Sequence, residues 1–485
     1  MRTLLWFRGK DLRVSDHPAL ASALAAGEIV PVFVLDPYFF APARAAELPH
    51  RIQFLLGSLQ SLAANLKHLG TELLLVSGKS VDVIPRLAAR LKVNRIAAQR
   101  WTEPFARERD RRVAAAAGVP FELFEGETLA TPGTLRTNGG TPFAVYSAFA
   151  RTFERRVRIP APLPAPQSLP PIPANLRALV SQLAEPLPTP ESLGLSVNPR
   201  LPDPGERAAK QRLQCFLENA LASYAGDRDR LDLPGTSRLS QDLKFGTLSV
   251  RSAYRAASHS VEDAPTTSDG IARFRAELLW REFAYYLLWE HPELLESPFR
   301  REFAKFPYRS DEASWLAWVE GKTGYPVVDA ASRQLLGEGF VHNRARMISA
   351  SFLTKHLLID YRQGEAHYMK YLTDGDWASN NLGWQWSAGC GCDAQPYFRV
   401  FNPVTQGRKF DPMGDYVRRW VPELSALPNR YLHAPWEAPE SVLKAAGVRL
   451  GKEYPRPIVQ HELARARFLD LASKTFKKSA PPRTG

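Results

Sequence analysis

Residues 1–35 read MRTLLWFRGKDLRVSDHPALASALAAGEIVPVFVL, in which short β-rich runs flank an Ala- and Leu-rich stretch. The same alternation continues through the first 125 residues. The β-rich runs lie at residues 3–7, 29–35, 72–76, 95–98 and 120–124, and helical stretches include 51–69, 81–91 and 104–117. Strands that alternate with helices are typical of βαβ units in a parallel sheet, which binds ligands at the carboxyl ends of its strands. The sequence therefore predicts a Rossmann-like α/β domain at the N-terminus.

The chain changes character after this domain. Residues 160–204 hold 13 of the 40 prolines, a density that breaks helices and disfavours sheet interiors. From about Arg207 onward the pattern is helical, with helices expected at residues 271–290, 343–361 and 365–372. We expect an α/β domain joined by a long Pro-rich linker to a mostly α-helical domain. The predicted divisions are an α/β domain at 1–130, a linker at 131–205, a helical domain at 206–470 and a short basic tail at 471–485.

The charge of the chain indicates a kind of partner without locating it. Among 485 residues there are 63 Lys and Arg against 50 Asp and Glu, a net charge of +13. Such an excess favours a polyanionic partner such as nucleic acid, or else reflects an Arg-rich surface alone. The excess is +8 over residues 1–200, −2 over 201–400 and +7 over 401–485. Bulk charge therefore identifies no binding site.

Composition excludes several classes of protein. Apolar residues make up 45% of the chain, so general disorder is not expected. No apolar run reaches the roughly 20 residues of a membrane helix, and Arg8 interrupts the first apolar run too early for a signal peptide. Cys215, Cys390 and Cys392 provide neither a disulfide framework nor metal-ligand spacing. We therefore expect a cytoplasmic protein with no bound metal and no membrane contact.

Longer motifs point to one family. They are Trp6-Phe7-Arg8, GTSRLS at 235–240, ELLWREF at 277–283, HNRARM at 342–347, DGDWASNNLGWQW at 374–386 and YFRVFNP at 397–403. In this order and spacing they resemble the photolyase/cryptochrome family, and the resemblance covers nearly the whole chain. Within the family, the chain is most similar to class I-type photolyases that act on cyclobutane pyrimidine dimers.

The resemblance implies a light-dependent DNA-repair enzyme, a deoxyribodipyrimidine photo-lyase, with FAD buried in its helical domain. In this family excited FADH⁻ gives an electron to a dimer flipped out of the DNA, the ring opens, and the electron returns. The implied partner is UV-damaged DNA, single- or double-stranded, and the implied protein is a monomer. The sequence contains no Ser/His/Asp, Cys/His or HExxH arrangement, which agrees with chemistry carried by a cofactor.

The resemblance also implies a lesion pocket with aromatic walls, Trp280 and Trp386. Glu277, three residues before Trp280 on the same helix face, would hydrogen-bond the pyrimidine edge. Asn343 and Met347 are an i, i+4 pair and would share the next face of the pocket. The alternatives are core packing for the tryptophans and for Met347, and an ion pair of Glu277 with a neighbouring arginine, Arg273 or Arg281.

Further residues are implied in binding the flavin and the DNA backbone. Asn380 would lie beside flavin N5, where plant cryptochromes carry Asp. The rest of the cradle would consist of Tyr224, Thr236, Ser237, Arg238, Leu239, Ser240, Arg346, Asp374, Gly375 and Asp376. Hydroxyls and backbone amides suit a pyrophosphate, and Arg346 would pair with Asp374 near the isoalloxazine. The DNA contacts would be Arg228, Arg281, Asn343, Arg344, Arg399 and Gln406, with ordinary surface solvation as the alternative for each arginine.

The sequence departs from the family in the residues that carry electrons to the flavin. Many members have three tryptophans for photoreduction; here Trp384 matches the first, while Tyr361 and Tyr308 occupy the second and third positions. Tyrosine usually loses its phenolic proton when it is oxidised, so the standard route is in doubt. The sequence leaves open another route, through Trp289, Trp315 or Trp318.

Two further questions concern the antenna and the class of protein. Residues 103–110 (EPFARERD) favour an 8-hydroxy-5-deazaflavin or FMN antenna over a folate. The main alternative to repair is a cryptochrome, a light-signalling protein, which Asn380 and the short tail after Arg467 disfavour. A (6-4) photolyase is disfavoured by the Asn343–Met347 pair, and a flavin-free nucleic-acid-binding protein by the intact cradle.

Overall fold

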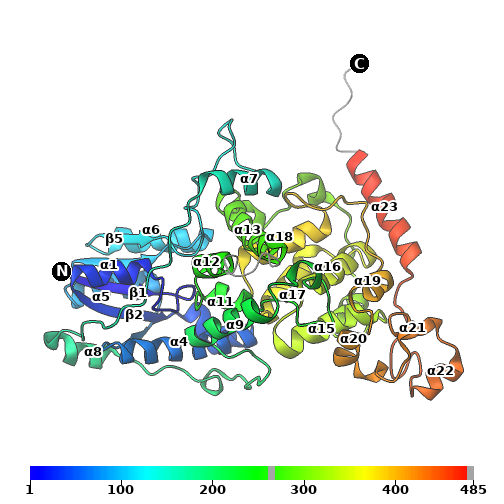
Figure 1. The fold of residues 1–485 in the computed structure, drawn as a ribbon, viewed down its shortest axis with the longest axis horizontal. Coiled ribbons are helices and arrows are strands. Elements are labelled where there is room, and N and C mark those ends of the chain that lie inside the picture. The colour runs from blue at the N-terminus through cyan, green and yellow to red at the C-terminus, as the bar shows by residue number, and fades with distance from the viewer. Residues whose placement is uncertain (260–267, 478–485) are drawn as a thin grey trace. The chain divides into compact units, whose positions relative to one another are not determined.

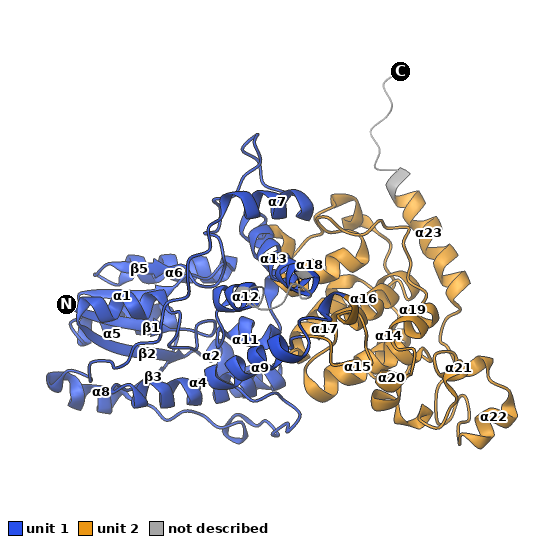
Figure 2. Cartoon of the chain, in the orientation of Figure 1, with its two compact units in different colours: residues 1–225, 237–292, 373–378 blue, residues 226–236, 293–372, 379–485 orange. Residues whose placement is uncertain are grey.

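The computed structural model describes residues 1–259 and 268–477. The chain divides into two compact units, shown in Figure 2. Unit 1 comprises residues 1–225, 237–292 and 373–378, and unit 2 comprises residues 226–236, 293–372 and 379–485. The short stretches 226–236 and 373–378 thus belong to a different unit from the residues that flank them. The predicted domain boundaries stay predictions, and residues 478–485 of the predicted tail lie outside the described residues.

A five-stranded parallel sheet forms the centre of the α/β part of unit 1 (Figure 1). Its strands are β1 (Arg2–Phe7), β2 (Glu28–Leu35), β3 (Leu74–Ser77), β4 (Arg95–Gln99) and β5 (Phe121–Phe124). Their order is β3-β2-β1-β4-β5, and Leu5 of β1 lies opposite Pro31 on one side and Ala97 on the other. Each β-rich run of the sequence overlaps one strand, so the predicted parallel α/β domain is confirmed.

Helices cover both faces of this sheet. Leu5, Phe7 and Phe33 pack on one face with α1 and α4, whereas Leu4 and Trp6 pack on the other face with α5 and α6. Alternate residues of a strand face opposite sides, so a strand that is covered on both faces reads as a continuous apolar run. The helices that lie wholly or partly in unit 1 are α1 (Pro18–Ala26), α2 (Pro37–Phe40), α3 (Pro42–Ala46), α4 (Pro49–His68), α5 (Ser80–Arg90), α6 (Pro104–Ala116), α7 (Tyr146–Arg156), α8 (Arg177–Leu183), α9 (Glu206–Asn219), α10 (Tyr224–Asp227, which ends in unit 2), α11 (Ser240–Phe245), α12 (Val250–His259) and α13 (Ser268–Glu290).

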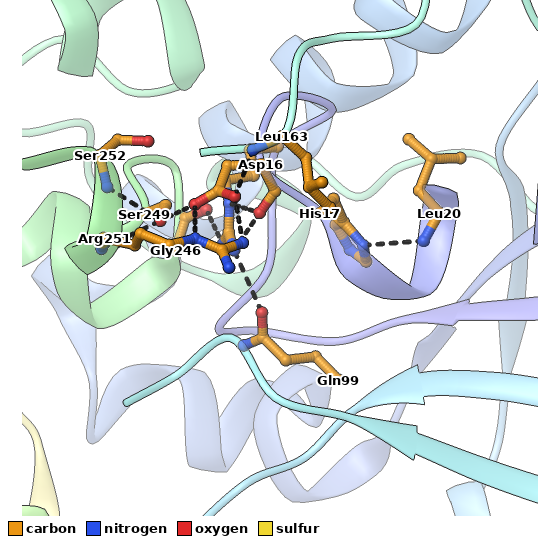
Figure 3. Close-up of polar contacts among 10 residues, drawn as sticks. Asp16, His17, Leu20, Gln99, Leu163, Gly246, Ser249, Arg251 and Ser252 are labelled. Atoms are coloured by element: carbon orange, nitrogen blue, oxygen red, sulfur yellow. Dashed lines mark hydrogen bonds and ion pairs between the residues drawn. The ribbon is translucent and has the colours of Figure 1, made fainter. Parts of the chain in front are cut away.

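A buried acid, Asp16, fixes the loop between β1 and α1 (Figure 3). Its carboxylate accepts the Ser249 hydroxyl and the Leu163 backbone N–H, the latter at 2.9 Å, and pairs with Arg251 at 3.0 Å. Its backbone lies in the left-handed region, with φ of 49°, and its carbonyl accepts Arg13 Nη2 at 2.9 Å. Asp16 therefore joins three segments of unit 1 that are distant in sequence.

The Pro-rich stretch 160–204 is part of unit 1 and packs against its α/β region. The Leu169 N–H donates to the Leu69 carbonyl at 2.7 Å and the Glu185 N–H to the Leu75 carbonyl at 2.9 Å. The stretch also contains α8, whose Val180 packs against the sheet. Because the stretch belongs to unit 1, its role as an interdomain linker stays a prediction.

Unit 2 is helical around one apolar core, in which Trp318, Phe352 and Leu424 are fully buried. This confirms the predicted mostly α-helical part of the chain. Its helices are α14 (Glu312–Val319), α15 (Pro326–Glu338), α16 (Asn343–Ser351), α17 (Tyr361–Tyr371), α18 (Trp377–Ala388, which begins in unit 1), α19 (Pro403–Phe410), α20 (Asp415–Trp420), α21 (Asn429–Leu432), α22 (Glu440–Ala445) and α23 (His461–Lys477). Among the described residues, no helix is long and apolar enough to cross a membrane.

The predicted single helix at 343–361 is wrong in its second half. Helix α16 ends at Ser351, a π-helical turn follows over Phe352–His356, and Leu358 has φ of 57°. Asp360 then starts α17, because its carboxylate accepts the Arg362 backbone N–H at 3.0 Å and caps the new helix. The predicted helix at 365–372 begins at residue 361 for the same reason.

Candidate functional site

The carboxyl ends of β1, β4 and β5 carry a buried charge cluster in unit 1. Lys10, Glu103 and Glu127 follow these strands in that order. Lys10 Nζ lies 2.5 Å from Glu127 Oε1 and 3.3 Å from Asp376 Oδ2, and it also pairs with Glu103. Tyr285 donates its hydroxyl to the same Asp376 oxygen at 2.7 Å. Burial opposes the charge on Lys10, but the surrounding carboxylates outweigh it and raise the pKa of this amine.

The turn Asp374-Gly375-Asp376 is held in unit 1 by two cations. Lys10 binds Asp376, and Arg51 approaches Gly375 so closely that a Cβ at this position would collide with the guanidinium. Burial lowers the pKa of Arg51 to about 10, and Asp374 opposes that shift. Glycine is therefore required at position 375 by the packing of Arg51, and the Asp376 carboxylate is held by Lys10.

Glu277 and Trp280 lie one turn apart on α13 in unit 1, as their spacing predicts. The Trp280 ring stacks on Tyr146, with ring centroids 3.7 Å apart and planes 8° apart. Glu277 Oε1 lies 3.5 Å from Arg273 Nη2, and the Glu277 side chain stays 25% exposed. The alternative ion pair of Glu277 with Arg273 is therefore present. Trp280 is only partly buried, so its indole is not an enclosed core residue.

Arg281, one residue further along α13, turns into the charge cluster. It donates to the Glu127 carbonyl at 2.9 Å, and its Cζ lies 4.2 Å from the centroid of the Tyr285 ring. Burial opposes its charge, but Tyr285 and the neighbouring carboxylates raise the pKa of Arg281. Its guanidinium is thus engaged by protein groups of unit 1.

Residues 235–240 form a polar turn that precedes α11. Arg238 has φ of 51°, a region that residues with side chains rarely adopt. Among the described residues, the hydroxyls of Thr236, Ser237 and Ser240 make no hydrogen bond, so they are available as donors. This donor set fits the oxygens of a pyrophosphate. The remaining cradle residues nearby in sequence, Tyr224 and Leu239, are buried in unit 1.

Helix α16 in unit 2 carries Asn343 and Met347 on one face, as predicted. Asn343 Nδ2 lies 3.8 Å from Met347 Sδ, within reach of a weak hydrogen bond. His342 caps the helix by accepting the Arg344 backbone N–H at 3.1 Å, and burial lowers the pKa of His342 to about 4. Arg344 pairs with Asp229 at 2.6 Å. The helix therefore presents a neutral amide and a thioether beside a paired arginine.

Asn380 in α18 has a fixed amide orientation. Its Nδ2 donates to the Glu365 carbonyl at 3.1 Å, which leaves Oδ1 without a partner among the described residues. The adjacent Asn381 donates to the Glu365 carboxyl at 3.1 Å and to the Leu294 carbonyl at 2.8 Å. Burial raises the pKa of Glu365 to about 7, although the bond from Asn381 opposes it. A free amide oxygen fits a ring N–H such as N5–H of a reduced flavin, so these residues fit that cofactor.

Trp384, one turn after Asn380, is 3% exposed and packs against Gly364 of α17. A Cβ at Gly364 would lie 2.5 Å from Trp384 Cζ3 and 2.5 Å from Leu353 Cδ2. Contacts of this length do not occur between carbon atoms in packed interiors. The glycine therefore sets how deeply the indole is seated between α17 and α18.

Replacing Gly364 by alanine is expected to lower the free energy of unfolding by about 1–3 kcal/mol through overpacking. Alanine is the better helix former, so the sign of the change tests the contact with Trp384. Gly383→Ala is the matched control, since a Cβ there meets nothing within 4 Å; it should raise stability by up to about 1 kcal/mol. Urea unfolding followed by tryptophan fluorescence measures both, and equal effects would contradict the packing argument.

The other predicted contacts lie in unit 2 with different exposures. Arg399 is exposed, Trp386 and Gln406 are partly buried, and Arg228 is buried at 9% exposure. Arg346 donates its Nε to the Val341 carbonyl at 2.7 Å. Of these residues, Arg399 presents its guanidinium most openly to a ligand in solution.

Comparison with known proteins places the chain in a family. Residues 3–167 match DNA photolyase, and residues 274–474 match the FAD-binding domain of DNA photolyase. The deoxyribodipyrimidine photo-lyase of Synechococcus sp. is 39% identical, over 99% of this chain and 98% of its own length. The chain belongs to the photolyase/cryptochrome family. The family expected from the motifs, with its FAD-binding helical domain, is thereby confirmed.

Two solved structures of the family have the same fold. The class III photolyase of Agrobacterium tumefaciens matches with a TM-score of 0.89 and 39% identity, over 98% of both chains. A cryptochrome of Synechocystis sp. PCC6803 matches with a TM-score of 0.88 and 31% identity, over 97% of this chain and 99% of the other. The fold is therefore shared with a photolyase and with a cryptochrome.

Several residues around these sites were not predicted from the sequence. Lys10 and Tyr285 were missed because the charge cluster joins residues that are hundreds of positions apart. Lys10 did carry a usable signal, since it lies three residues after the end of a predicted strand, at the ligand-binding edge of a parallel sheet. Tyr146, which stacks on Trp280, carries no comparable signal.

Proposed function

We propose that this chain is a CPD photolyase that uses light to split cyclobutane pyrimidine dimers in DNA. The structural feature that carries the proposal is the Asn380 amide, whose NH₂ is tied to the Glu365 carbonyl and whose oxygen is free. That oxygen accepts a hydrogen bond from N5–H of a reduced flavin and not from oxidised FAD, whose N5 carries no hydrogen. The FADH⁻ that the proposed repair requires is one of the forms with N5–H. The relatives named deoxyribodipyrimidine photo-lyase, such as that of Synechococcus sp., support the same activity.

Each residue has a definite task in this proposal. When bound, FADH⁻ supplies the light-driven electron, and the chain supplies no nucleophile or proton. Thr236, Ser237, Arg238 and Ser240, with the backbone at Leu239, would bind the pyrophosphate. The other cradle residues, Tyr224, Arg346, Asp374, Gly375 and Asp376, would hold the rest of the cofactor. Arg346 would stabilise negative charge on the reduced ring.

The lesion would be bound by aromatic and polar side chains. Trp280 and Trp386 would stack on the flipped pyrimidines, since base–aromatic stacking contributes about 1–3 kcal/mol per base. Glu277 would hydrogen-bond the pyrimidine edge once it leaves Arg273, a partner it holds at 3.5 Å and near solvent. Asn343 and Met347 would contact the dimer from α16. Flipping a damaged pair costs less than flipping an intact one.

Arg399 is the DNA contact with the clearest test. Replacing Arg399 by alanine should weaken binding to UV-damaged DNA by about 1 kcal/mol, roughly fivefold in Kd, and reduce the salt slope by about one. Arg449→Ala is the control, because Arg449 pairs with Glu453 on the surface and has no assigned DNA contact. Fluorescence anisotropy over a series of salt concentrations measures both. Equal losses would mean that the bulk charge of +13 drives binding.

The proposed activity is tested by incubating the purified protein with UV-irradiated oligothymidine in blue light and in the dark. Recovery of the absorbance of intact thymine only in light supports a CPD photolyase. No recovery in either condition, from protein whose flavin has been reduced with dithionite, contradicts the proposal. The same result would favour the second candidate, a light-signalling cryptochrome, which the match to the Synechocystis cryptochrome supports.

The finer properties follow the sequence-based expectations. We propose that the substrate DNA is single- or double-stranded, that the protein acts as a monomer in the cytoplasm, and that a second chromophore, a deazaflavin or FMN, serves as antenna. Analytical ultracentrifugation measures the oligomeric state, and the fluorescence of released chromophores identifies the antenna.

A further inference from the structure

Three tryptophans of unit 2 form a continuous series of ring contacts. The rings of Trp384 and Trp318 lie 6.1 Å apart between centroids at an interplanar angle of 72°, and those of Trp318 and Trp315 lie 5.4 Å apart at 24°. Trp318 is fully buried and Trp384 is 3% exposed, whereas Trp315 reaches the surface in part. The series therefore leads from the interior of unit 2 to solvent.

This arrangement has a local cause in α14. Trp315 and Trp318 are three residues apart on this helix, so their side chains lie on the same face. Their rings stack, and the inner ring meets Trp384 of α18 edge to face. Tyr368 packs against both inner indoles, with centroids 6.0 Å from Trp318 and 5.1 Å from Trp384. The tryptophan ladder, as we call Trp384, Trp318 and Trp315, is thus fixed by packing.

The surroundings of the tryptophan ladder suit a transient positive charge. The Trp318 indole N–H donates to the Ser349 carbonyl at 3.3 Å, and a carbonyl dipole at this position stabilises the oxidised ring. His367 lies 5.5 Å from Trp318 and 5.6 Å from Trp315 between ring centroids. Burial, together with Lys370, lowers the pKa of His367 to about 4. His367 is therefore neutral at pH 7 and does not repel a charge on the indoles.

The two tyrosines at the family's relay positions are poorly placed for oxidation. Tyr361 is 2% exposed, and its buried hydroxyl has no hydrogen-bond partner among the described residues. Burial raises the pKa of Tyr361 and of Tyr308 above the ordinary range of a phenol. A tyrosine that is oxidised must release its proton to an acceptor, and Tyr361 has none in contact.

We propose that electrons reach the flavin of this chain through the tryptophan ladder rather than through Tyr361 and Tyr308. The proposal rests on the flavin assigned above, beside which the family places Trp384. Trp384 gives one electron to the photoexcited oxidised flavin and becomes a radical cation. Trp318 then reduces Trp384, and Trp315 reduces Trp318. A dissolved thiol gives one electron to Trp315 and releases a proton, which leaves a thiyl radical. A second photon would drive a second electron along the same route, and the two thiyl radicals combine into a disulfide. The flavin would then hold both electrons and one of the two released protons.

The test compares phenylalanine variants for flavin photoreduction in blue light with excess thiol. Trp315→Phe and Trp318→Phe should each reduce the flavin about tenfold more slowly, because phenylalanine has no accessible radical and raises the barrier. Tyr361→Phe and Tyr308→Phe should remain within about twofold of the unchanged protein. Transient absorption should show an indole radical, without a tyrosyl radical, in the unchanged protein.

Two control variants test whether the loss of any tryptophan slows photoreduction. Trp436→Phe changes a partly buried indole of the same unit that packs on Tyr325, with ring centroids 5.2 Å apart, and should leave photoreduction unchanged. Trp289→Phe, in unit 1, should also have no effect, because its ring is covered by Arg107 at 4.0 Å. Should the loss of the buried Trp318 impair folding or flavin content, Trp315→Phe decides, since its ring is partly exposed.

The proposed electron route through the tryptophan ladder and the proposed repair activity can be tested independently of each other. Protein whose flavin has been reduced with dithionite needs no photoreduction, so all variants should then repair oligothymidine dimers at the same rate in light. Loss of repair in the unchanged protein would overturn the proposed function and leave the photoreduction comparison readable. Normal photoreduction in both Trp315→Phe and Trp318→Phe, or an equal slowing in Tyr361→Phe, would overturn the ladder.

Discussion

Replacing Asp16 by asparagine is expected to lower the free energy of unfolding by about 3 kcal/mol, because removing one partner of a buried ion pair leaves the other charge uncompensated. Asp16 is 1% exposed and forms an ion pair with Arg251. Asparagine keeps an oxygen that can accept a hydrogen bond from Arg251, but it carries no negative charge. The backbone is not the cause of the expected loss. Asparagine adopts the left-handed conformation at least as readily as aspartate, so the φ of 49° is preserved.

The control is a surface ion pair of the same unit. Arg2 Nε lies 2.7 Å from Glu28 Oε2, and the Glu28 side chain is 51% exposed. Glu28→Gln should lower stability by less than about 1 kcal/mol, as is usual for exposed pairs. Urea unfolding at pH 7, followed by fluorescence, measures both variants. If Asp16→Asn changes the free energy of unfolding no more than Glu28→Gln does, the Asp16–Arg251 ion pair between the β1–α1 loop and α12 does not stabilise the fold.

The Asp16–Arg251 ion pair is an example of a contact that the sequence does not predict. No motif of the sequence assigned a role to Asp16, and nothing in its spacing indicated a partner such as Arg251, 235 positions away. The periodic parts of the sequence were more informative. Apolar runs such as IVPVFVL predict strands that are covered on both faces, because burial on both sides removes the polar alternation. The predicted sheet was therefore confirmed strand by strand.

Local breaks in helices were less predictable. The pattern at 343–361 reads as one helix because it contains no glycine or proline. The structure ends that helix through a π-helical turn and the positive φ of Leu358, and neither feature has a marker in the sequence. Asp360 is a recognisable N-cap, but it shows only that a helix begins there. Tertiary packing decided where the preceding helix ended.

In the candidate site, too, contacts within one helix could be predicted from the sequence, whereas contacts between different elements could not. Pairs that depend on helical spacing, such as Asn343 with Met347, could be placed on one face from the sequence alone. The charge cluster around Lys10 and the tryptophan ladder could not, since their members come from different strands and helices. The sequence identified Trp318 only as one of three tryptophans through which electrons could reach Trp384. Its contact with Trp384 depends on the packing of α14 against α18, which no spacing rule encodes.

Replacing Glu365 by glutamine is expected to raise the free energy of unfolding by about 3 kcal/mol at pH 8 and by less than about 1 kcal/mol at pH 5. Burial raises the pKa of Glu365 to about 7, above the value of about 4.3 in an unfolded chain. The folded protein therefore binds a proton in this interval that the unfolded chain releases. Stability contributed by the neutral carboxyl is present at low pH and is lost as the pH rises toward 7.

Glutamine keeps the shape of the neutral acid and its acceptor for Asn381, which donates to Glu365 at 3.1 Å, but it cannot ionise. The advantage of the variant should therefore open between pH 5 and 7 and stay constant above, as measured by urea unfolding at several pH values. Glu320→Gln, in an exposed pair with Lys322, should change stability by less than about 1 kcal/mol at every pH. An advantage of Glu365→Gln that did not grow with pH would mean that the carboxyl is ionised in the native protein. Asn380, which is held by the Glu365 carbonyl, would then lie beside a negative charge, and that charge would oppose an anionic reduced flavin at the same place.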